Sequence, residues 1–298
     1  MTEATSANAG WVSRVQGRAT AFVAIIAIAA TLSACGTSTY VLREQPSTNQ
    51  DGRVRHLILH YTSEDTDESL RLLTQPSSNP VSSHYLVDRP DGRRGNVRVY
   101  RLVPESARAW HAGRSHWLGE TALNASSIGI EIVNESACTP QETLEGCAFT
   151  PYPPEQIDAV IALCQEILAR HPDIEPWRVL AHSDIAPSRR VDPGPQFPWR
   201  ALHEAGVGAW YDEDAAERWR GRFEANAPSL PTLQRALIAW GFDLEPTGAP
   251  DDATRDAVRA LQLHFRPTRH DGRIDTDTSA ILFALLERYR PQTLDTLR

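Results

Sequence analysis

Val54-Arg-His-Leu-Ile-Leu-His-Tyr61 is a β-branched and leucine-rich run, which is typical of a mostly buried strand. Two further strands are predicted downstream, at His84–Asp88 and Val97–Val103. The turn signal Asp91-Gly92 separates these two runs. The first folded domain therefore opens with strands that predict a sheet, and the later motifs are located relative to that sheet.

A second group of elements alternates strands with helices. Ser127-Ile-Gly-Ile-Glu-Ile-Val-Asn134 places three isoleucines on one face of a strand and Gly129, Glu131 and Val133 on the other. A helix is predicted over Pro154–His171, where apolar residues recur at helical spacing before a proline. Val179-Leu-Ala-His182 ends another strand. This interleaving predicts an α/β domain over residues 52–211, with a mixed central sheet flanked by helices.

From Ser229 onward the pattern predicts helices alone. Three apolar stripes recur at helical spacing, consisting of Leu230, Leu233, Leu237 and Trp240, then Ala257, Val258, Leu261 and Phe265, then Ile281, Leu282, Leu285 and Leu286. We expect a small three-helix domain over residues 229–298, near the lower size limit for independent stability. The polar, acidic stretch 212–228 predicts a linker between the two domains.

The N-terminus has the layout of a secretory signal. Arg14 and Arg18 precede the apolar run Ala19–Leu32, which is shorter than the roughly 20 residues that span a bilayer. Leu32-Ser-Ala-Cys35 follows, and it resembles a lipoprotein processing box in which the cysteine thiol carries the lipid. We expect a signal peptide over 1–34 and a lipidated Cys35 with a flexible tether over 35–51. The alternative is an ordinary cleavage site with an incidental cysteine.

Composition narrows the class of partner and compartment. The net charge of −8 gives no electrostatic basis for binding nucleic acid. Cys138 and Cys147 flank a polar segment and could close a disulfide in an oxidising compartment, whereas Cys164 lies on a predicted helix face as a buried free thiol. The sequence gives no sign of an oligomer, so we expect a monomer.

Two histidines stand at strand ends and an aspartate follows one of them. His60 ends the first strand, His182 ends a later one, and Asp192 follows ten positions after His182. A lone strand-end histidine is more often a hydrogen-bonded structural residue than a ligand. Two imidazoles and a carboxylate, however, leave the fourth tetrahedral position open, as a catalytic zinc requires.

These motifs resemble the zinc-dependent N-acetylmuramoyl-L-alanine amidases, which share a fold with the peptidoglycan recognition proteins. The resemblance spans Val54 to Tyr211 and rests on Leu59-His-Tyr-Thr62, Ser127-Ile-Gly-Ile-Glu131 and the run from His182 through Asp192-Pro-Gly-Pro to Trp199. The last run resembles the periplasmic lipoprotein amidases of enterobacteria. The resemblance implies one zinc ion held by His60, His182 and Asp192, and hydrolysis of the amide that joins N-acetylmuramic acid to L-alanine.

The same resemblance assigns two further roles. Glu131 matches the general base and acid of the family, although a strand glutamate alone could simply face solvent. Arg190 stands where close relatives carry a lysine that stabilises the oxyanion. An arginine keeps the charge but differs in shape and reach. The adjacent Arg189 could be the one that turns inward instead.

Three residues are candidates for lining the cleft. We expect His84 to line the cleft, with a structural hydrogen bond as an equal alternative. Trp110 and His111, on a predicted loop over the cleft, could pack on the glycan or the stem peptide, with ordinary loop packing as the alternative. The remaining histidines carry no functional expectation.

The C-terminal helices resemble the three-helix peptidoglycan-binding repeat, across nearly all of Ser229–Tyr289. Peptidoglycan or muropeptides are therefore the expected partners, and in a Gram-negative host the lipid on Cys35 would place the chain at the outer membrane facing the periplasm. Two other functions compete. A non-catalytic peptidoglycan receptor on the same fold typically lacks a metal ligand, and a metallopeptidase is disfavoured because no His-Glu-x-x-His motif occurs.

Overall fold

The computed structural model describes residues 43–50, 52–92, 96–138 and 144–297. The chain divides into two compact units, residues 1–49 and 50–298. The predicted signal peptide and Cys35 lie outside the described residues. Residues 43–49 are exposed and belong to neither a helix nor a strand. Within the described residues, no helix is long and apolar enough to cross a membrane.

The second unit is built around a five-stranded mixed sheet in the order β3-β2-β6-β1-β7. β1 (His56–Tyr61) lies between β6 (Ser127–Ile132) and β7 (Val179–Ala181) and is parallel to both. β2 (Tyr85–Val87) is parallel to β6, while β3 (Val99–Arg101) runs antiparallel to β2. The strands predicted from the apolar runs are therefore present, and the expected α/β class with a mixed sheet is confirmed.

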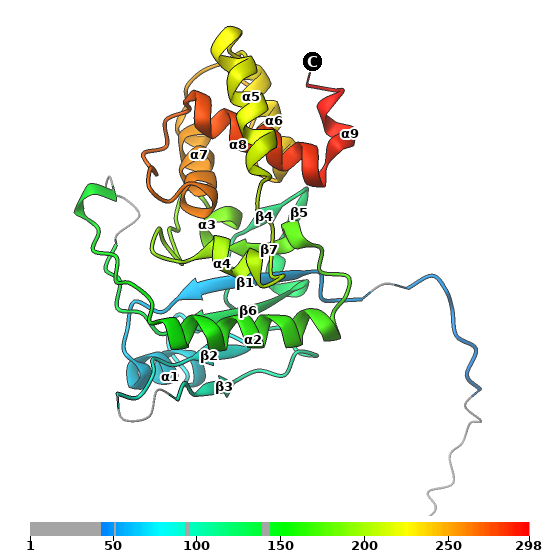
Figure 1. Cartoon of the computed structure of the whole chain (residues 1–298). Helices are drawn as coiled ribbons and strands as arrows, with labels where there is room; N and C mark the ends of the chain where they lie inside the picture. Colours follow the sequence, from blue (N-terminus) through cyan, green and yellow to red (C-terminus); the bar gives the residue numbers. More distant parts are fainter. Residues whose placement is uncertain (1–42, 51, 93–95, 139–143, 298) are drawn as a thin grey trace, which may run out of the picture. The chain divides into compact units, whose positions relative to one another are not determined.

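Helix α2 (Pro154–Arg170) covers the sheet, and α1 (Thr66–Thr74) lies near β2 (Figure 1). α2 begins at a proline, which suits the first helical position because its missing N–H has no partner there. Its buried side chains Ile157, Val160 and Ile167 recur at helical spacing and join the core formed with the sheet.

Shorter elements connect these layers. They are β4 (His116–Trp117), β5 (Glu120–Thr121), η1 (Leu123–Ala125), η2 (Leu144–Gly146), η3 (Pro176–Arg178), α3 (His182–Ile185), α4 (Trp199–Glu204) and α9 (Pro291–Leu294). β4 and β5 form a separate two-stranded antiparallel sheet. α3 follows β7 directly, so the last strand of the large sheet runs straight into a short helix.

The C-terminal region is helical, as predicted. Its helices are α6 (Leu230–Trp240), α7 (Asp252–Phe265) and α8 (Thr276–Tyr289). Each of these helices starts with a side-chain oxygen that accepts a backbone N–H three residues later, from Ser229, Asp251 or Asp275. The three apolar stripes face inward and form the bundle core, with Leu230 at its margin.

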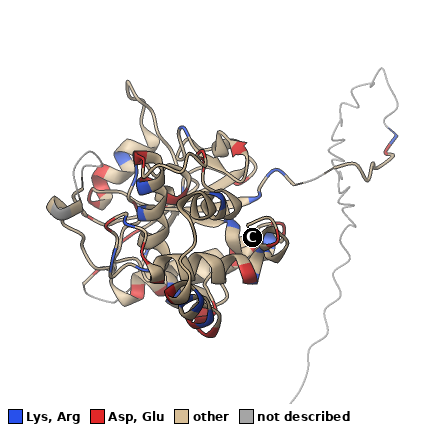
Figure 2. Cartoon of the chain, turned by 90° about the horizontal axis from the view of Figure 1, so that it is seen from above, with Lys and Arg blue, Asp and Glu red and all other residues tan. Residues whose placement is uncertain are grey.

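The segment 212–228 is not the expected linker. It contains α5 (Glu213–Ala225), which is capped by Asp212 and packs along α8. Phe223 of α5 contacts Phe283 of α8 with ring centroids 5.0 Å apart. Acidic and basic residues are interspersed over the helices (Figure 2). Because Ala215 and Phe223 are the buried residues of α5, its sequence is mostly polar and resembles a tether.

The bundle and the sheet domain belong to one compact unit and share a core. The Trp117 ring lies edge-on to Trp240 and Phe242, at centroid distances of 6.3 and 5.5 Å. Gly241 approaches this ring so closely that a Cβ there would lie 2.5 Å from Trp117 Cε2. The Leu118 N–H donates to the Gly241 carbonyl at 3.0 Å, which pins the two domains together.

A buried polar pair lies at the same interface. His264 of α7 and Asp184 of α3 are both buried, with Nδ1 and Oδ2 2.7 Å apart. Asp184 Oδ2 also accepts the backbone N–H of Ala181 at 2.8 Å, and the His264 ring stacks on Trp199 at 3.8 Å. The bundle therefore supports the turn that joins β7 to α3.

We expect His264→Ala to lower the free energy of unfolding by about 3 kcal/mol, because it leaves the Asp184 carboxyl buried without its partner. Urea denaturation of the chain measures this loss. His171→Ala is the matched control, since His171 pairs with Glu105 at the same 2.7 Å but is partly exposed. The control should cost about 1 kcal/mol or less. Equal losses in the two variants would show that burial of the pair is not the cause.

Candidate active site

Parallel pairing brings the candidate residues to one edge of the sheet. His60 of β1 and Glu131 of β6 are register partners near the ends of adjacent strands. Leu59 pairs with Ala181, the last residue of β7, so His182 follows at the same edge. Since parallel strands end together, three residues from distant parts of the sequence meet there.

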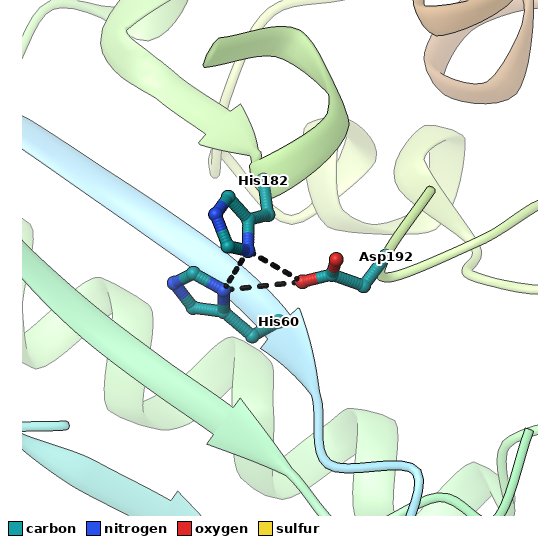
Figure 3. A group of neighbouring side chains, drawn as sticks. All are labelled: His60, His182 and Asp192. Atoms are coloured by element: carbon teal, nitrogen blue, oxygen red, sulfur yellow. Dashed lines mark hydrogen bonds and ion pairs between the residues drawn. The ribbon is translucent and has the colours of Figure 1, made fainter. Parts of the chain in front are cut away.

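The two histidines and Asp192 point their ligand atoms at one another (Figure 3). His60 Nδ1 lies 2.9 Å from His182 Nδ1, and each of these nitrogens lies 3.1 Å from Asp192 Oδ2. All three residues are buried. The structure therefore brings together the three residues that the sequence offered as metal ligands.

Hydrogen bonding alone cannot satisfy this triangle. Each imidazole Nδ1 carries at most one proton and a carboxylate oxygen carries none, so at most two of the three contacts can be hydrogen bonds. A cation between the atoms would face a lone pair from each. Ligands about 2.0–2.1 Å from a tetrahedral zinc lie about 3.3 Å apart, close to the spacing observed. The donor set and its geometry fit zinc.

The electrostatics of the triangle favour the protonation states that bind metal. Burial, reinforced by His182, lowers the pKa of His60 to about 4, so its imidazole is neutral near pH 7. Burial alone would raise the pKa of Asp192, but the two imidazoles outweigh it and the pKa falls below its usual range. Neutral imidazoles and an ionised carboxylate are the forms that coordinate zinc.

The loop that carries Asp192 is fixed on several sides. The Ser183 N–H donates to the Asp192 carbonyl at 3.1 Å, and the Tyr152 hydroxyl donates to the Pro193 carbonyl at 2.9 Å. Gly194 has φ +79°, and a Cβ there would lie 2.9 Å from the Phe149 ring. The short Pro-Gly turn therefore suits both the backbone conformation and the close approach.

Glu131 faces the same cavity as the triangle. Its Oε2 is enclosed and has no hydrogen-bond partner within the described residues. Burial, helped by repulsion from the Asp192 carboxylate, raises the pKa of Glu131 well above its usual value, against the attraction of Arg190. An enclosed carboxyl with an unpartnered oxygen and a raised pKa has the properties of a group that exchanges protons.

A cavity of about 210 Å³ surrounds the site. Its lining includes the polar side chains of His60, His182, Asp192, Glu131 and Arg190 and the apolar side chains of Leu72, Leu73, Val81 and Trp110. Val81 and Trp110 are 42% and 49% exposed, so two large apolar side chains stand at the rim. The cavity thus offers both polar and apolar side chains to a ligand.

The two neighbouring arginines separate in the structure. Arg190 is exposed and lines the cavity. Arg189 turns away toward the loop at 112–114, where its Nη2 donates to the Ala112 and Arg114 carbonyls at 2.5 and 2.6 Å. Arg189 therefore holds a loop, and Arg190 is the arginine that faces the cavity.

The three candidates for lining the cleft have different environments. His84 is buried away from the cavity, where its Nδ1 accepts the Gly129 N–H at 3.0 Å and its Nε2 lies 3.3 Å from the Ala107 carbonyl. It has the structural hydrogen bonds that were the alternative to a lining role. Trp110 lies exposed at the rim, whereas His111 is mostly buried, borders the cavity and contacts the His60 ring.

The structure joins Cys138 to Cys147 in a disulfide, and Cys138 also lines the cavity. Residues 139–143 of this segment are outside the described residues. Within the described part of the chain, Cys164 is a buried free cysteine on α2. The disulfide therefore closes a segment beside the site.

Sequence reasoning missed the supporting residues. His264 and Asp184 are 80 positions apart and meet only because the bundle docks on α3. Ser127 and His111 meet because the alternating strand carries a glycine at 129, where the His111 ring fits. The sequence signal for this contact was a glycine in a strand and a histidine in a preceding loop. The two residues cannot be matched until the fold is known.

Comparisons with known proteins agree with this geometry. Residues 50–195 match the family model N-acetylmuramoyl-L-alanine amidase, and residues 226–282 match a peptidoglycan binding domain model. The chain is 44% identical over 242 residues to the N-acetylmuramoyl-L-alanine amidase AmiD of Escherichia coli, covering 80% of this chain and 84% of the relative. An AmpD amidase of Enterobacter cloacae is 40% identical over 110 residues, 37% of this chain and 52% of the relative.

Solved structures extend the likeness to the fold. AmpDh3 from Pseudomonas aeruginosa superposes with a TM-score of 0.75 at 41% identity, covering 83% of this chain and 96% of that one. The complex of E. coli AmiD with anhydro-N-acetylmuramic acid-L-Ala-D-gamma-Glu-L-Lys superposes with a TM-score of 0.70 at 41% identity, covering 82% and 93%.

We expect the purified chain to bind one zinc ion tightly and Asp192→Asn to bind it far more weakly. The amide keeps the shape of the side chain but removes the charge of a direct ligand. The loss should exceed the roughly 10–100-fold typical of changes behind the ligands. Competition with a chromogenic chelator measures the affinity. Glu131→Gln, beside the triangle but not part of it, is the control and should bind as the unaltered chain does.

Proposed function

Because the chain belongs to the N-acetylmuramoyl-L-alanine amidase family, we propose that it cleaves peptidoglycan with one zinc ion held by His60, His182 and Asp192. The bond cut by this family joins the lactyl group of N-acetylmuramic acid to L-alanine. The observation that carries the zinc proposal is the triangle of facing ligand atoms, which hydrogen bonds alone cannot satisfy. When bound, zinc supplies a Lewis acid that polarises a carbonyl and acidifies water.

Glu131 is proposed as the residue that moves the proton. Its carboxyl faces the cavity beside the three ligands, and its enclosed Oε2 is free to accept a proton from water there. Its raised pKa lets it hold that proton near neutral pH and deliver it to the L-alanine nitrogen as the amide bond breaks. Base and acid are then one group used in sequence.

Arg190 is proposed to stabilise the negative charge that develops on the carbonyl oxygen. It is the arginine that lines the cavity, whereas Arg189 is engaged with backbone carbonyls. A guanidinium supplies the same charge as the lysine of relatives, with a planar set of donors in place of a compact ammonium. A fixed positive charge aimed at the developing oxyanion is usually a large contribution to catalysis.

The substrate is proposed to be a muropeptide whose sugar meets the apolar rim. Solved relatives hold ligands of this kind, an anhydromuramic pentapeptide in AmpDh3 and an anhydro-muramyl tripeptide in AmiD. In this chain the exposed Trp110 and Val81 line the same cavity as the ligands, and an indole there could cover one face of a sugar ring. The three ligand residues would then meet the amide.

The rest of the chain is proposed to deliver this site to the cell wall. The module at 226–282 matches peptidoglycan-binding domains and would hold the substrate polymer near the cavity. We propose that Leu32-Ser-Ala-Cys35 is processed and lipidated and that the chain acts as a monomer in cell-wall turnover. The lipid would anchor it at the outer membrane facing the periplasm in a Gram-negative host, and at the cell-surface membrane otherwise. The disulfide beside the cavity supports an oxidising compartment.

The proposed catalytic domain is 52–211, followed by the wall-binding module with α5 as part of its bundle.

A direct test incubates the chain with purified muropeptides and reads the products by mass spectrometry. We expect release of intact peptides that begin with L-alanine, loss of this activity on chelation and its return with zinc. Glu131→Gln should lower kcat by about 100- to 10,000-fold while zinc stays bound, because only proton transfer is removed. A zinc-loaded, unaltered chain that binds muropeptides without cutting them would favour the receptor instead.

Arg190→Ala should lower kcat by about 100-fold, as expected for loss of one oxyanion donor, with zinc affinity unchanged. Arg190→Lys should recover most of the activity, because the charge returns. Steady-state turnover of a muropeptide measures both. Arg71→Ala, which removes an exposed arginine of α1 that pairs with Glu68, is the control for lost charge. Turnover of Arg190→Ala equal to that of the control would rule out the oxyanion role.

A further inference from the structure

A chain of hydrogen bonds runs behind the metal triangle. His60 turns its other ring nitrogen, Nε2, toward His111 Nδ1 at 3.0 Å. His111 Nε2 in turn lies 3.2 Å from Ser127 Oγ, and Ser127 Oγ lies 2.6 Å from the Leu123 carbonyl oxygen. All four residues of this hydrogen-bond series are buried, and His60 and His111 also border the cavity.

The last member of the chain fixes the direction of every bond in it. A carbonyl oxygen can only accept, so the Ser127 hydroxyl donates to Leu123. The Ser127 oxygen then accepts from His111 Nε2–H, which leaves His111 Nδ1 without a proton. His111 Nδ1 therefore accepts from His60 Nε2–H. The proton of His60 is thus held on Nε2, and its Nδ1 presents a lone pair to His182 and Asp192.

The position of the His111 ring is itself determined by packing. A Cβ on Gly129 of β6 would lie 2.5 Å from His111 Cγ, so the ring occupies the space that a side chain at 129 would fill. The backbone N–H groups of His111 and Ala112 both donate to Asn124 Oδ1, at 3.0 and 2.8 Å. The ring is therefore held from the backbone side and from the strand side.

We propose that His111 is a positioning residue that locks His60 in the tautomer and ring orientation needed to bind zinc. Ser127 and the Leu123 carbonyl set the direction of the lock, and Gly129 provides the room for it. This inference rests on the proposed zinc site. It gives His111 a role in holding a metal ligand, besides its place in the lining of the cavity.

The general chemistry of metal sites supports this assignment. A histidine ligand usually donates its second N–H to a neighbouring acceptor, and this bond fixes the tautomer and ring orientation. His182 has a backbone carbonyl for this purpose, with Nε2 3.4 Å from the Ala112 oxygen. His60 has the imidazole of His111 instead, so its acceptor depends on a side chain that can be replaced.

The test measures zinc affinity of the full chain by chelator competition in three variants. His111→Phe keeps the bulk of the ring and removes both nitrogens, and we expect zinc to bind about 10- to 100-fold more weakly. His111→Asn places an amide oxygen near the position of Nδ1 and should recover part of the loss. Gly129→Ala keeps both nitrogens of His111 but crowds the ring, since its Cβ would lie 2.5 Å from Cγ and 2.6 Å from Nδ1, and it should weaken zinc binding in the same sense.

A second readout separates positioning from simple packing. Thermal unfolding of the zinc-free chain should show a modest loss in His111→Phe, because the buried His60 Nε2–H loses its acceptor, and the rise in Tm on adding zinc should shrink as well. The ¹⁵N chemical shifts of the His60 ring should report the Nε2–H tautomer in the unaltered chain and a mixture of tautomers in His111→Phe. Unchanged zinc affinity in His111→Phe would overturn the inference. The same holds if His111→Phe and His111→Asn lose equal stability in the zinc-free state and neither loses zinc affinity. An unaltered chain that takes up no zinc would overturn the proposed function itself.

Discussion

The parallel pairing of β1 with both β6 and β7 is the constraint from which the site follows. Parallel neighbours end at a common edge, so His60, Glu131 and His182 reach one place although they are widely separated in sequence. The buried apolar faces of these strands fix the register, because a one-residue slip would turn Glu131 into the core and an isoleucine toward the cavity. The positions of the site residues are therefore fixed by the same core packing that fixes the strand register.

Support for the site comes from behind the ligands and from the far side of the chain. His111 and Ser127 hold the ring of His60 through the sheet, while the bundle holds the turn after β7 through His264 and Asp184. Neither pair has a role as a reacting group. Both restrict side chains whose ligand atoms must stay within a few tenths of an ångström of one another, which is the precision that a metal site demands.

The sequence was sufficient for the elements that depend on local pattern. Strand runs, helix stripes and the strand-end positions of His60 and His182 follow from apolar periodicity, so the sheet and the bundle were predictable. The assignment of these two histidines and Asp192 as ligands came from the resemblance to the amidase family, and the structure brings the three together. Helix α5 was not, since a helix that buries little of its surface has the composition of a linker. The environments of His84 and His111 also depend on packing around Gly129. Its backbone N–H donates to His84 Nδ1, and its missing side chain leaves the space that the His111 ring fills.

The shared core of the two domains has a consequence for how the polymer is presented. Trp117 is enclosed by Trp240 and Phe242, and Gly241 fits against its ring, so the wall-binding bundle does not hang on a loose connection. A glycan strand held by the bundle would then meet the cavity at one set distance and angle. The gain in effective concentration would depend on matching that offset to the spacing of stem peptides along the strand, and not on the length of a linker. The docked bundle therefore fixes the distance between the polymer that it binds and the cavity.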